Sequence, residues 1–403
     1  MMFGHFKDYG NDPIEGVFAR LAADTNTDKI DLGIGVYRDD SGQVPVMQAV
    51  RLAEKAVIEK QLPKSYLSPL GNLDYCRAIE RLVLGAEHPL IDSGRIISAQ
   101  TPGAGSALRV AAELVNDIAP NARAWFSDPV WFHQLQFFEK AGMQLGSYRY
   151  YDQQKSVLLF EEMLDDLRNM QAGDLLVLHG CCHNPTGEDL ELEQWRAVVD
   201  VVLETGAVPF VDVAYQGFGQ GIEEDVAGLR LLAARVPQAL LTVSSSKSFG
   251  VYRDRAGLLS IITPPDAADV ESIARKLRDT ARQLYFMAPD HAATVVHEIL
   301  ATPEFEQAWR NELDALREHI ADKRKALRAT IEAEIPYFDG SFIERQLGMF
   351  SCLPISGDEQ RTLEDEYHIY MLPNARVNVA AMSNTQAVTL GRAFRDVRDR
   401  RST

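Results

Sequence analysis

One lysine in this chain follows an apolar segment in a setting that suits covalent chemistry. Lys247 comes directly after three serines within residues 244–250, and Arg255 lies eight residues further on. An amine placed there can form a Schiff base with an aldehyde, while hydroxyls and a guanidinium bind a phosphate dianion. The segment therefore suits a covalently held aldehyde cofactor that carries a phosphate. A solvated lysine in a serine-rich loop is the alternative that this short motif leaves open.

A second candidate is an acidic residue that nearly completes another apolar run. Asp212 lies in residues 208–213, and Tyr215 follows three positions later. A carboxylate is costly to bury unless it meets a cation. A protonated pyridine nitrogen is such a cation, and a carboxylate beside it keeps the ring an electron acceptor. Tyr215 could reach a phenolic oxygen of the same ring. The alternative role for Asp212 is to cap a helix after the strand.

A glycine-rich turn at residues 100–109 opens an apolar helical pattern. Gly103 and Gly105 flank Ala104 there. The unpaired N–H groups at such a helix start can bind phosphate, although a tight turn without a ligand is equally compatible with so short a motif. Two further candidates, His179 and His183, are four residues apart but follow a strand, so no helix presents both on one face. We expect no metal site, because structural zinc needs about four ligands.

These residues need a sheet to bring them together. Short apolar runs alternate with helical patterns, as in βαβ units with a mostly parallel sheet. Ligands bind beyond the carboxyl ends of such strands, where His179, Asp212 and Lys247 are found. The predicted strands cover residues 124–126, 175–179, 208–213, 240–244 and 257–262, and two of the predicted helices cover residues 192–204 and 226–235.

A long helix is predicted between Pro303 and Pro336. Its apolar residues recur at three- and four-residue steps and form one stripe: Trp309, Leu313, Leu316, Ile320, Leu327 and Ile331. We interpret this helix as the connector between a large domain at residues 44–314 and a smaller α+β domain. The smaller domain would comprise residues 315–403 together with an N-terminal arm at residues 1–43.

The composition excludes several classes of protein. A net charge of −17 leaves no excess of basic groups to neutralise nucleic-acid phosphates. The four cysteines lack the spacing of a disulfide framework or a metal knuckle, so we expect reduced, structural thiols. Neither an apolar run that could act as a signal peptide at residues 1–8 nor a membrane-spanning stretch is apparent, and we expect a cytoplasmic protein.

Five motifs in one order resemble the aspartate and aromatic amino acid aminotransferases, which are fold-type-I enzymes that use pyridoxal phosphate (PLP). The motifs are Thr-Pro-Gly-x-Gly-x-Ala-Leu-Arg, His-x-Cys-x-His-Asn-Pro-Thr-Gly, Asp-x-Ala-Tyr-Gln-Gly-Phe, Ser-x-Ser-Lys-x-Phe-Gly and Gly-Met-Phe-Ser followed by Arg-Val-Asn-Val-Ala. The likeness runs from about Asp12 to Arg395. It implies a mostly parallel central sheet in a large domain, with a long helix leading to a smaller one.

The resemblance also implies a role for each matching residue. Lys247 would form the Schiff base with PLP and then move the proton between the substrate and the cofactor. Asp212 would pair with the ring nitrogen, Asn184 and Tyr215 would bond the ring oxygen, and Trp131 would stack on the ring. The implied phosphate ligands are Ala104, Gly105, Ser244, Ser246 and Arg255, with Tyr66 from the other subunit of a homodimer.

For the substrate, the resemblance implies two carboxylate anchors. Arg376 would hold the α-carboxylate with the help of the Gly35 backbone, and Arg282 of the other subunit would meet a distal carboxylate. Both Asp128-Pro129 and Asn184-Pro185 would be cis peptides. The chain departs from the family pattern at four positions: Gly105 stands where a threonine is common, Gln134 where a histidine is common, and Phe286 and Met287 replace small polar residues.

We therefore predict an aminotransferase that works by a ping-pong cycle. The side chains expected near the substrate, including Val44, Ser65, Phe286 and Met287, favour an aromatic amino acid with 2-oxoglutarate or another dicarboxylic acid as the acceptor. Arg282 favours the alternative, an aspartate aminotransferase. A PLP lyase or decarboxylase and a non-catalytic regulator remain further alternatives, because a fold does not determine a function.

Overall fold

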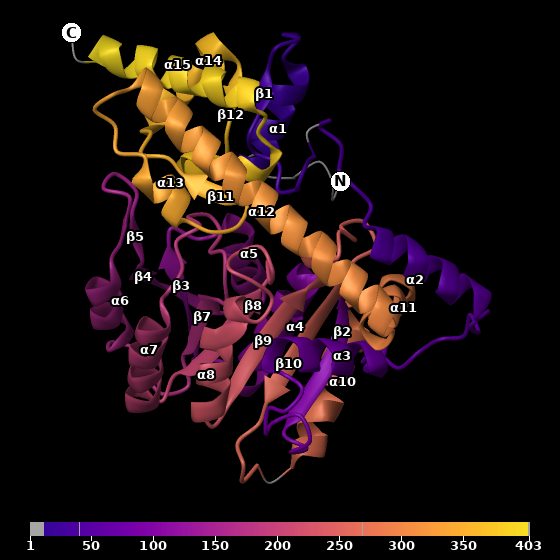
Figure 1. The fold of residues 1–403 in the computed structure, drawn as a ribbon. Helices are drawn as coiled ribbons and strands as arrows, with labels where there is room; N and C mark the ends of the chain where they lie inside the picture. The colour runs from indigo at the N-terminus through magenta and orange to yellow at the C-terminus, as the bar shows by residue number, and fades with distance from the viewer. Residues whose placement is uncertain (1–11, 40, 268, 402–403) are drawn as a thin grey trace, which may run out of the picture.

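A seven-stranded sheet forms the centre of the molecule (Figure 1). The structure, a computed structural model, describes residues 12–39, 41–267 and 269–401, so the expectation about a signal peptide falls outside it. The strand order is β2 (Ile96–Pro102), β10 (Ala256–Ile262), β9 (Ala239–Ser244), β8 (Val208–Val213), β7 (Leu175–His179), β3 (Arg123–Asp128) and β4 (Gln144–Arg149). β10 runs antiparallel to both neighbours, and the other paired strands run parallel.

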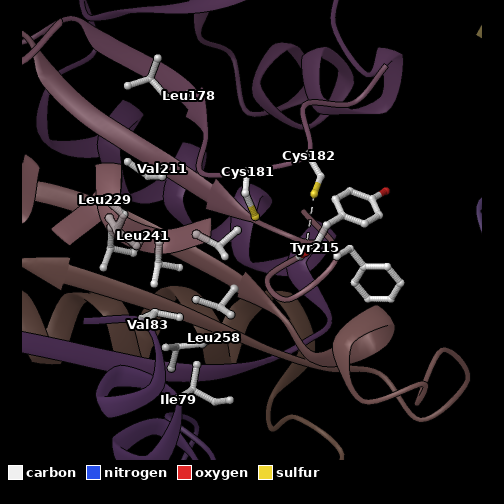
Figure 2. Packing of buried hydrophobic residues seen from close by; sticks show 14 of the residues in the cluster. Ile79, Val83, Leu178, Cys181, Cys182, Val211, Tyr215, Leu229, Leu241 and Leu258 are labelled. Carbon is white, nitrogen blue, oxygen red and sulfur yellow. Dashed lines mark hydrogen bonds between the residues drawn. The ribbon is translucent and has the colours of Figure 1, made fainter. Parts of the chain in front are cut away.

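Both faces of the sheet are buried, which explains why its strands read as continuous apolar runs. Alternate residues of one strand enter different cores: Leu176 and Leu178 of β7 point to one face, whereas Leu175 and Val177 point to the other. Figure 2 shows the first of these cores, where Val211, Leu241 and Leu258 of three neighbouring strands lie beside Ile79, Val83 and Leu229 of two helices.

Helices cover the two faces unequally. The first face carries α2 (Gln48–Glu59), α3 (Leu73–Leu84), α6 (Phe160–Leu167), α7 (Leu192–Thr205), α8 (Ala227–Arg235) and α11 (Asp290–Ala301). The second face carries α4 (Ala104–Ile118), α5 (Phe132–Lys140) and α10 (Val270–Tyr285). The one-turn helix α9 (Ser245–Ser248) follows β9, and β5 (Tyr151–Asp152) pairs with β6 (Val157–Leu158).

A second, smaller core lies around the carboxyl-terminal part of the chain. Two short sheets belong to this region: β1 (Ile30–Asp31) pairs with β12 (Ile369–Tyr370), and β11 (Phe350–Cys352) pairs with β13 (Arg376–Asn378). The helices here are α1 (Pro13–Ala23), α13 (Ser341–Arg345), α14 (Gly357–Tyr367) and α15 (Asn384–Arg401). Because β1 pairs with β12, an N-terminal segment packs against the end of the chain.

The long helix α12 (Pro303–Glu334) joins the two cores, as its uninterrupted apolar stripe predicts (Figure 1). Trp309, Leu313 and Ile320 pack in the core on the first face of the sheet. Leu327 and Ile331, further along the same stripe, pack in the smaller core. The predicted fold, with a mostly parallel sheet and a connecting helix, is confirmed, whereas the domain boundaries at residues 43 and 314 stay a prediction.

Three further expectations concern the two X-Pro peptide bonds, membrane spans and the cysteines. Asp128-Pro129 and Asn184-Pro185 are both cis, as the resemblance implies. In the part of the chain that the structure describes, every helix is too short or too polar to cross a bilayer. The four cysteines are buried free thiols.

Candidate active site

A cavity of about 440 Å³ opens where the carboxyl ends of β7, β8 and β9 meet the start of α4. Parallel strands bring such ends to one edge of the sheet, so residues far apart in sequence converge there. The cavity is lined by every predicted site residue of this subunit: Gly35, Ala104, Gly105, Trp131, Asn184, Asp212, Tyr215, Ser244, Ser246, Lys247, Arg255 and Arg376. Tyr66 and Arg282, predicted to serve the other subunit, are exposed and lie outside it.

One end of the cavity is built for an anion. Gly103 caps α4 with φ of 77°, which leaves the first N–H groups of the helix pointing outward. Arg255 lies across this start: a Cβ on Gly103 would come within 2.2 Å of its Nη2 atom. Arg255 Nη1 donates to Ser246 Oγ at 3.1 Å. A guanidinium, a hydroxyl and free N–H groups together match a phosphate dianion.

Gly257 shows how closely the backbone packs beneath this anion site. A Cβ on Gly257 would meet the carbonyl carbon of Gly103 at 2.5 Å, so only glycine fits there. Glycine at position 105, where the family pattern often has threonine, also has a steric reason. A Cβ on Gly105 would lie 3.0 Å from Phe137 Cζ. The Phe137 ring also lines the cavity and occupies space that a larger residue 105 would need.

Asp212 and Lys247 face the middle of the cavity from neighbouring strand ends. Asp212 is 5% exposed, and burial raises the pKa of its carboxyl to about 6 despite the opposing charge of Lys247. Burial lowers the pKa of Lys247 to about 8, so its amine loses a proton far more readily than an exposed lysine. The Nζ atom of Lys247 lies 4.9 Å from the centre of the Tyr215 ring.

The opposite end of the cavity holds a buried guanidinium. Arg376 donates from Nη1 to Asn184 Oδ1 at 2.9 Å and from Nη2 to the Gly33 carbonyl at 2.8 Å. Its Cζ atom lies 4.0 Å from the centre of the Phe350 ring. Arg376 has no carboxylate among these partners, and such a fork binds a carboxylate with two parallel hydrogen bonds.

Sequence reasoning missed several apolar residues that line the cavity. Ile14 and Phe18, one turn apart on α1, reach it from the N-terminal segment, and Leu372 reaches it from a small cluster that it forms with Val17 and Tyr370. The four-residue spacing of Ile14 and Phe18 was the available signal. His133 also lines the cavity, and its Nε2 atom lies 3.0 Å from Oδ2 of Asp12, the residue that caps α1.

The two histidines considered for a metal site have all four ring nitrogens in hydrogen bonds. His179 bonds Gln134 and the Asn184 N–H, and His183 bonds the hydroxyls of Ser127 and Thr186. Among the described residues, one group has metal-ligating atoms within 4.8 Å of one another: Cys181, Cys182 and Asp225. The carboxylate of Asp225 already accepts four backbone N–H bonds from the loop at residues 217–221.

The cavity fits PLP on two observations. Within the described residues, Asp212 Oδ1 and Arg376 Nε are buried and have no hydrogen-bond partner. Such atoms are costly unless a ligand satisfies them. A pyridinium nitrogen suits the carboxylate oxygen, and the anion site at Arg255 and Gly103 suits the phosphate. Lys247 is the one lysine among the described residues that line the cavity, and its amine would be the group to react with the aldehyde.

Known proteins resemble this chain along nearly its whole length. The family described as aminotransferase class I and II matches residues 27–393. The aspartate aminotransferase of Pseudomonas aeruginosa is 39% identical, over 95% of this chain and 96% of its own. The aromatic-amino-acid aminotransferase of Paracoccus denitrificans is 37% identical, over 98% and 100%. The crystal structure of the Burkholderia pseudomallei aromatic-amino-acid aminotransferase, covalently bound to pyridoxal phosphate, superposes with a TM-score of 0.93 at 38% identity, covering 98% of this chain and 99% of that one.

Proposed function

Because this chain belongs to the class I and II aminotransferases, we propose that it transfers the amino group of an aromatic amino acid to 2-oxoglutarate or another dicarboxylic 2-oxo acid. It is a PLP-dependent aminotransferase, an enzyme whose substrates are small molecules, namely amino acids and 2-oxo acids. When bound, PLP supplies an electron sink for the carbanion that forms on proton removal. A cytoplasmic location stays a prediction.

Two of the unpartnered buried atoms, Asp212 Oδ1 and Arg376 Nε, belong to residues that line the cavity, and they carry the assignment of roles. Asp212 binds the ring nitrogen through Oδ1, and Arg376 binds the substrate α-carboxylate beside the Gly35 backbone. Lys247 takes and returns the substrate proton, a task that its lowered pKa favours. Tyr215 and Asn184 bond the ring oxygen, Trp131 covers the ring, and the anion site holds the phosphate. The phosphate ligands in this proposal are Ala104, Gly105, Ser244, Ser246 and Arg255.

The apolar walls of the cavity support an aromatic amino acid. Ile14, Phe18 and Phe137 line it together with Phe350 and Leu372. Burying a phenyl group against such walls contributes about 1.5–3 kcal/mol. The name of the Paracoccus denitrificans relative agrees with this choice, while that of the Pseudomonas aeruginosa relative supports the aspartate alternative.

We further propose a homodimer in which each subunit completes the other's site. Tyr66 is 83% exposed and Phe286 is 55% exposed, and their rings meet edge to face at 5.8 Å. Phe286 has φ of 66°, a strained value for a bulky residue that is typical of functional positions. Further exposed apolar residues precede them in the chain: Val44, Val46, Leu52, Ile58 and Leu62. These residues all fall within one stretch of the chain, and exposed apolar residues that form one patch are typical of an interface.

Substrate preference is tested by measuring kcat/KM for phenylalanine and aspartate side by side. We expect phenylalanine to be used at least as well as aspartate, because the apolar walls favour the ring. Phe286 lies outside the cavity of its own subunit, but in the proposed dimer it serves the partner's site, so Phe286→Ser should shift the ratio towards aspartate. Tyr337→Ser, at an exposed aromatic residue with no proposed role in either site, should leave the ratio unchanged. If aspartate is preferred by more than about a hundredfold, or about 2.7 kcal/mol, the aromatic assignment is wrong.

Shared sites predict complementation between two defective subunits. Lys247→Ala removes the amine, and Arg282→Ala removes the distal anchor for 2-oxoglutarate. A mixed dimer has one site that lacks both groups and one intact site, so co-expression in equal amounts should restore about a quarter of wild-type activity. The assay uses phenylalanine with subsaturating 2-oxoglutarate. Activity no greater than that of the two variants assayed separately would show that both groups serve the same subunit's site.

A further inference from the structure

A chain of hydrogen bonds runs behind Asp212, away from the cavity. Gln134 on α5 is 1% exposed, and its Nε2 atom donates to Asp212 Oδ2 at 3.0 Å. Its Oε1 atom lies 3.2 Å from Nε2 of His179, at the end of β7. The backbone N–H of Asn184 donates to His179 Nδ1 at 3.0 Å. Two segments that are remote in sequence, α5 and the end of β7 with the turn after it, are thus joined to one oxygen of Asp212.

The direction of each bond in this chain follows from its first donor. A backbone N–H can only donate, so Nδ1 of His179 accepts and carries no proton. A neutral imidazole then carries its proton on Nε2, which donates to Gln134 Oε1. The amide nitrogen of Gln134 is left to face Asp212 and donate to it. Burial lowers the pKa of His179 to about 4, which agrees with a neutral ring at working pH.

This chain also determines which oxygen of Asp212 meets the cavity. With Oδ2 engaged by Gln134, Oδ1 is the buried oxygen without a partner among the described residues. The charged and titratable groups whose fields act on this carboxylate are Lys247 and Tyr215. The two groups behind this carboxylate, the Gln134 amide and the His179 ring, are neutral, so neither forms an ion pair with it. A histidine at position 134 could instead take up a proton there.

We propose that Gln134 is a positioning residue for the cofactor ring nitrogen: by donating to Oδ2 it holds Asp212 ionised and turned so that Oδ1 accepts from the ring. The inference rests on the role of Asp212 proposed above. A purely structural Gln134 would contribute to folding but would not affect how strongly the protein distinguishes a ring nitrogen from a ring CH group. That distinction can be measured without turnover.

The test compares the dissociation constants of PLP and of an analogue in which the ring nitrogen is replaced by CH. The Gln134→Met variant keeps the length of the side chain but cannot donate. We expect it to bind PLP about tenfold more weakly than the wild type while binding the analogue equally well, because only PLP uses the oriented carboxylate. Gln134→His, which can donate with one ring nitrogen and accept with the other, should restore the preference for PLP.

Proton positions provide a second readout in cofactor-free protein. With 15N-labelled histidine, NMR should show His179 as the neutral Nε2–H form in the wild type, and its Nε2 resonance should shift in Gln134→Met. If Gln134→Met does not fold, Gln134→Leu takes its place, since its side chain can neither donate to Asp212 nor accept from His179. An unchanged preference for PLP over the analogue in a folded variant overturns the inference. If Asp212→Asn also leaves that preference unchanged, the proposed role of Asp212 fails as well.

Discussion

Lys247→Ala should bind PLP non-covalently and lose turnover by at least about 10⁴-fold. General acid–base catalysis by a positioned side chain contributes about 10²- to 10⁴-fold, and this variant also loses the covalent attachment of the cofactor. The lowered pKa of Lys247 makes it the amine best suited to both tasks. Turnover is measured by coupled assay, and cofactor retention by absorbance after gel filtration.

Chemical trapping identifies the lysine independently of activity. Borohydride reduction of the wild-type enzyme with PLP, followed by peptide mass mapping, should locate the cofactor on Lys247. Lys155→Ala serves as the matched control, because Lys155 is an exposed lysine paired with Asp152 on the surface. Trapping on any other lysine, or substantial turnover by Lys247→Ala, would contradict the assignment.

Asp212→Asn should reduce kcat/KM on the order of 10³-fold and, at the same time, stabilise the cofactor-free protein. In the proposed site the substitution removes the negative charge beside the ring nitrogen. Leaving one member of a buried ion pair without its partner costs about 3–5 kcal/mol. The folded protein without PLP has the opposite balance, because it buries a carboxylate whose Oδ1 has no partner among the described residues. Stability and activity should therefore change in opposite directions.

The pH dependence of this stabilisation follows from the raised pKa of Asp212. Its carboxyl has an ordinary pKa of 3.8 and a pKa of about 6 in the folded protein, so the folded state binds the proton more tightly. The favourable contribution of Asp212 is complete below about pH 4 and is lost as the pH rises through about 6. Asparagine does not ionise, so the variant's advantage should grow from near zero at pH 4 to at most about 3 kcal/mol above pH 6.

Denaturant unfolding of both cofactor-free proteins between pH 4 and pH 8 measures this difference. Asp174→Asn is the matched control, at a buried aspartate that directly precedes β7. Asp174 is equally buried but accepts bonds from Arg123, Trp125 and Gln171, so its replacement should destabilise the fold without changing kcat per folded molecule. A variant Asp212→Asn that is less stable than the wild type at pH 7 would contradict the prediction.

The sequence alone determined most of the sheet and the chemistry of the site. Strands buried on both faces read as short apolar runs, and all five predicted strands match β3, β7, β8, β9 and β10. Both edge strands escaped prediction. β4 is only partly buried and its pattern is weak, whereas β2 is buried but its last residues were interpreted as the start of the glycine-rich turn. The direction of β10 was also left open, because an apolar run has the same composition in either direction.

The sequence also indicated which side chains are reactive, because few residue types can bind an aldehyde, a pyridinium nitrogen or a phosphate. Lys247, Asp212 and Arg255 each follow a local pattern of apolar, hydroxyl or glycine residues. Family motifs added Arg376 and Asn184, which no local pattern singles out. All of them line one cavity because parallel strands end at the same edge of the sheet.

The tertiary structure alone decided which atoms of these residues are available. Arg376 bonds Asn184 and Gly33, which lie 192 and 343 positions away in the chain, and is left with an unpartnered Nε. Gln134 bonds Oδ2 of Asp212 across 78 positions, while Oδ1 has no partner among the described residues. Such contacts depend on how separate strands and helices pack, and sequence periodicity records only the environment of each element. The sequence therefore determined which reactive side chains are present. Packing decided which of their atoms bond one another and which are left without a partner.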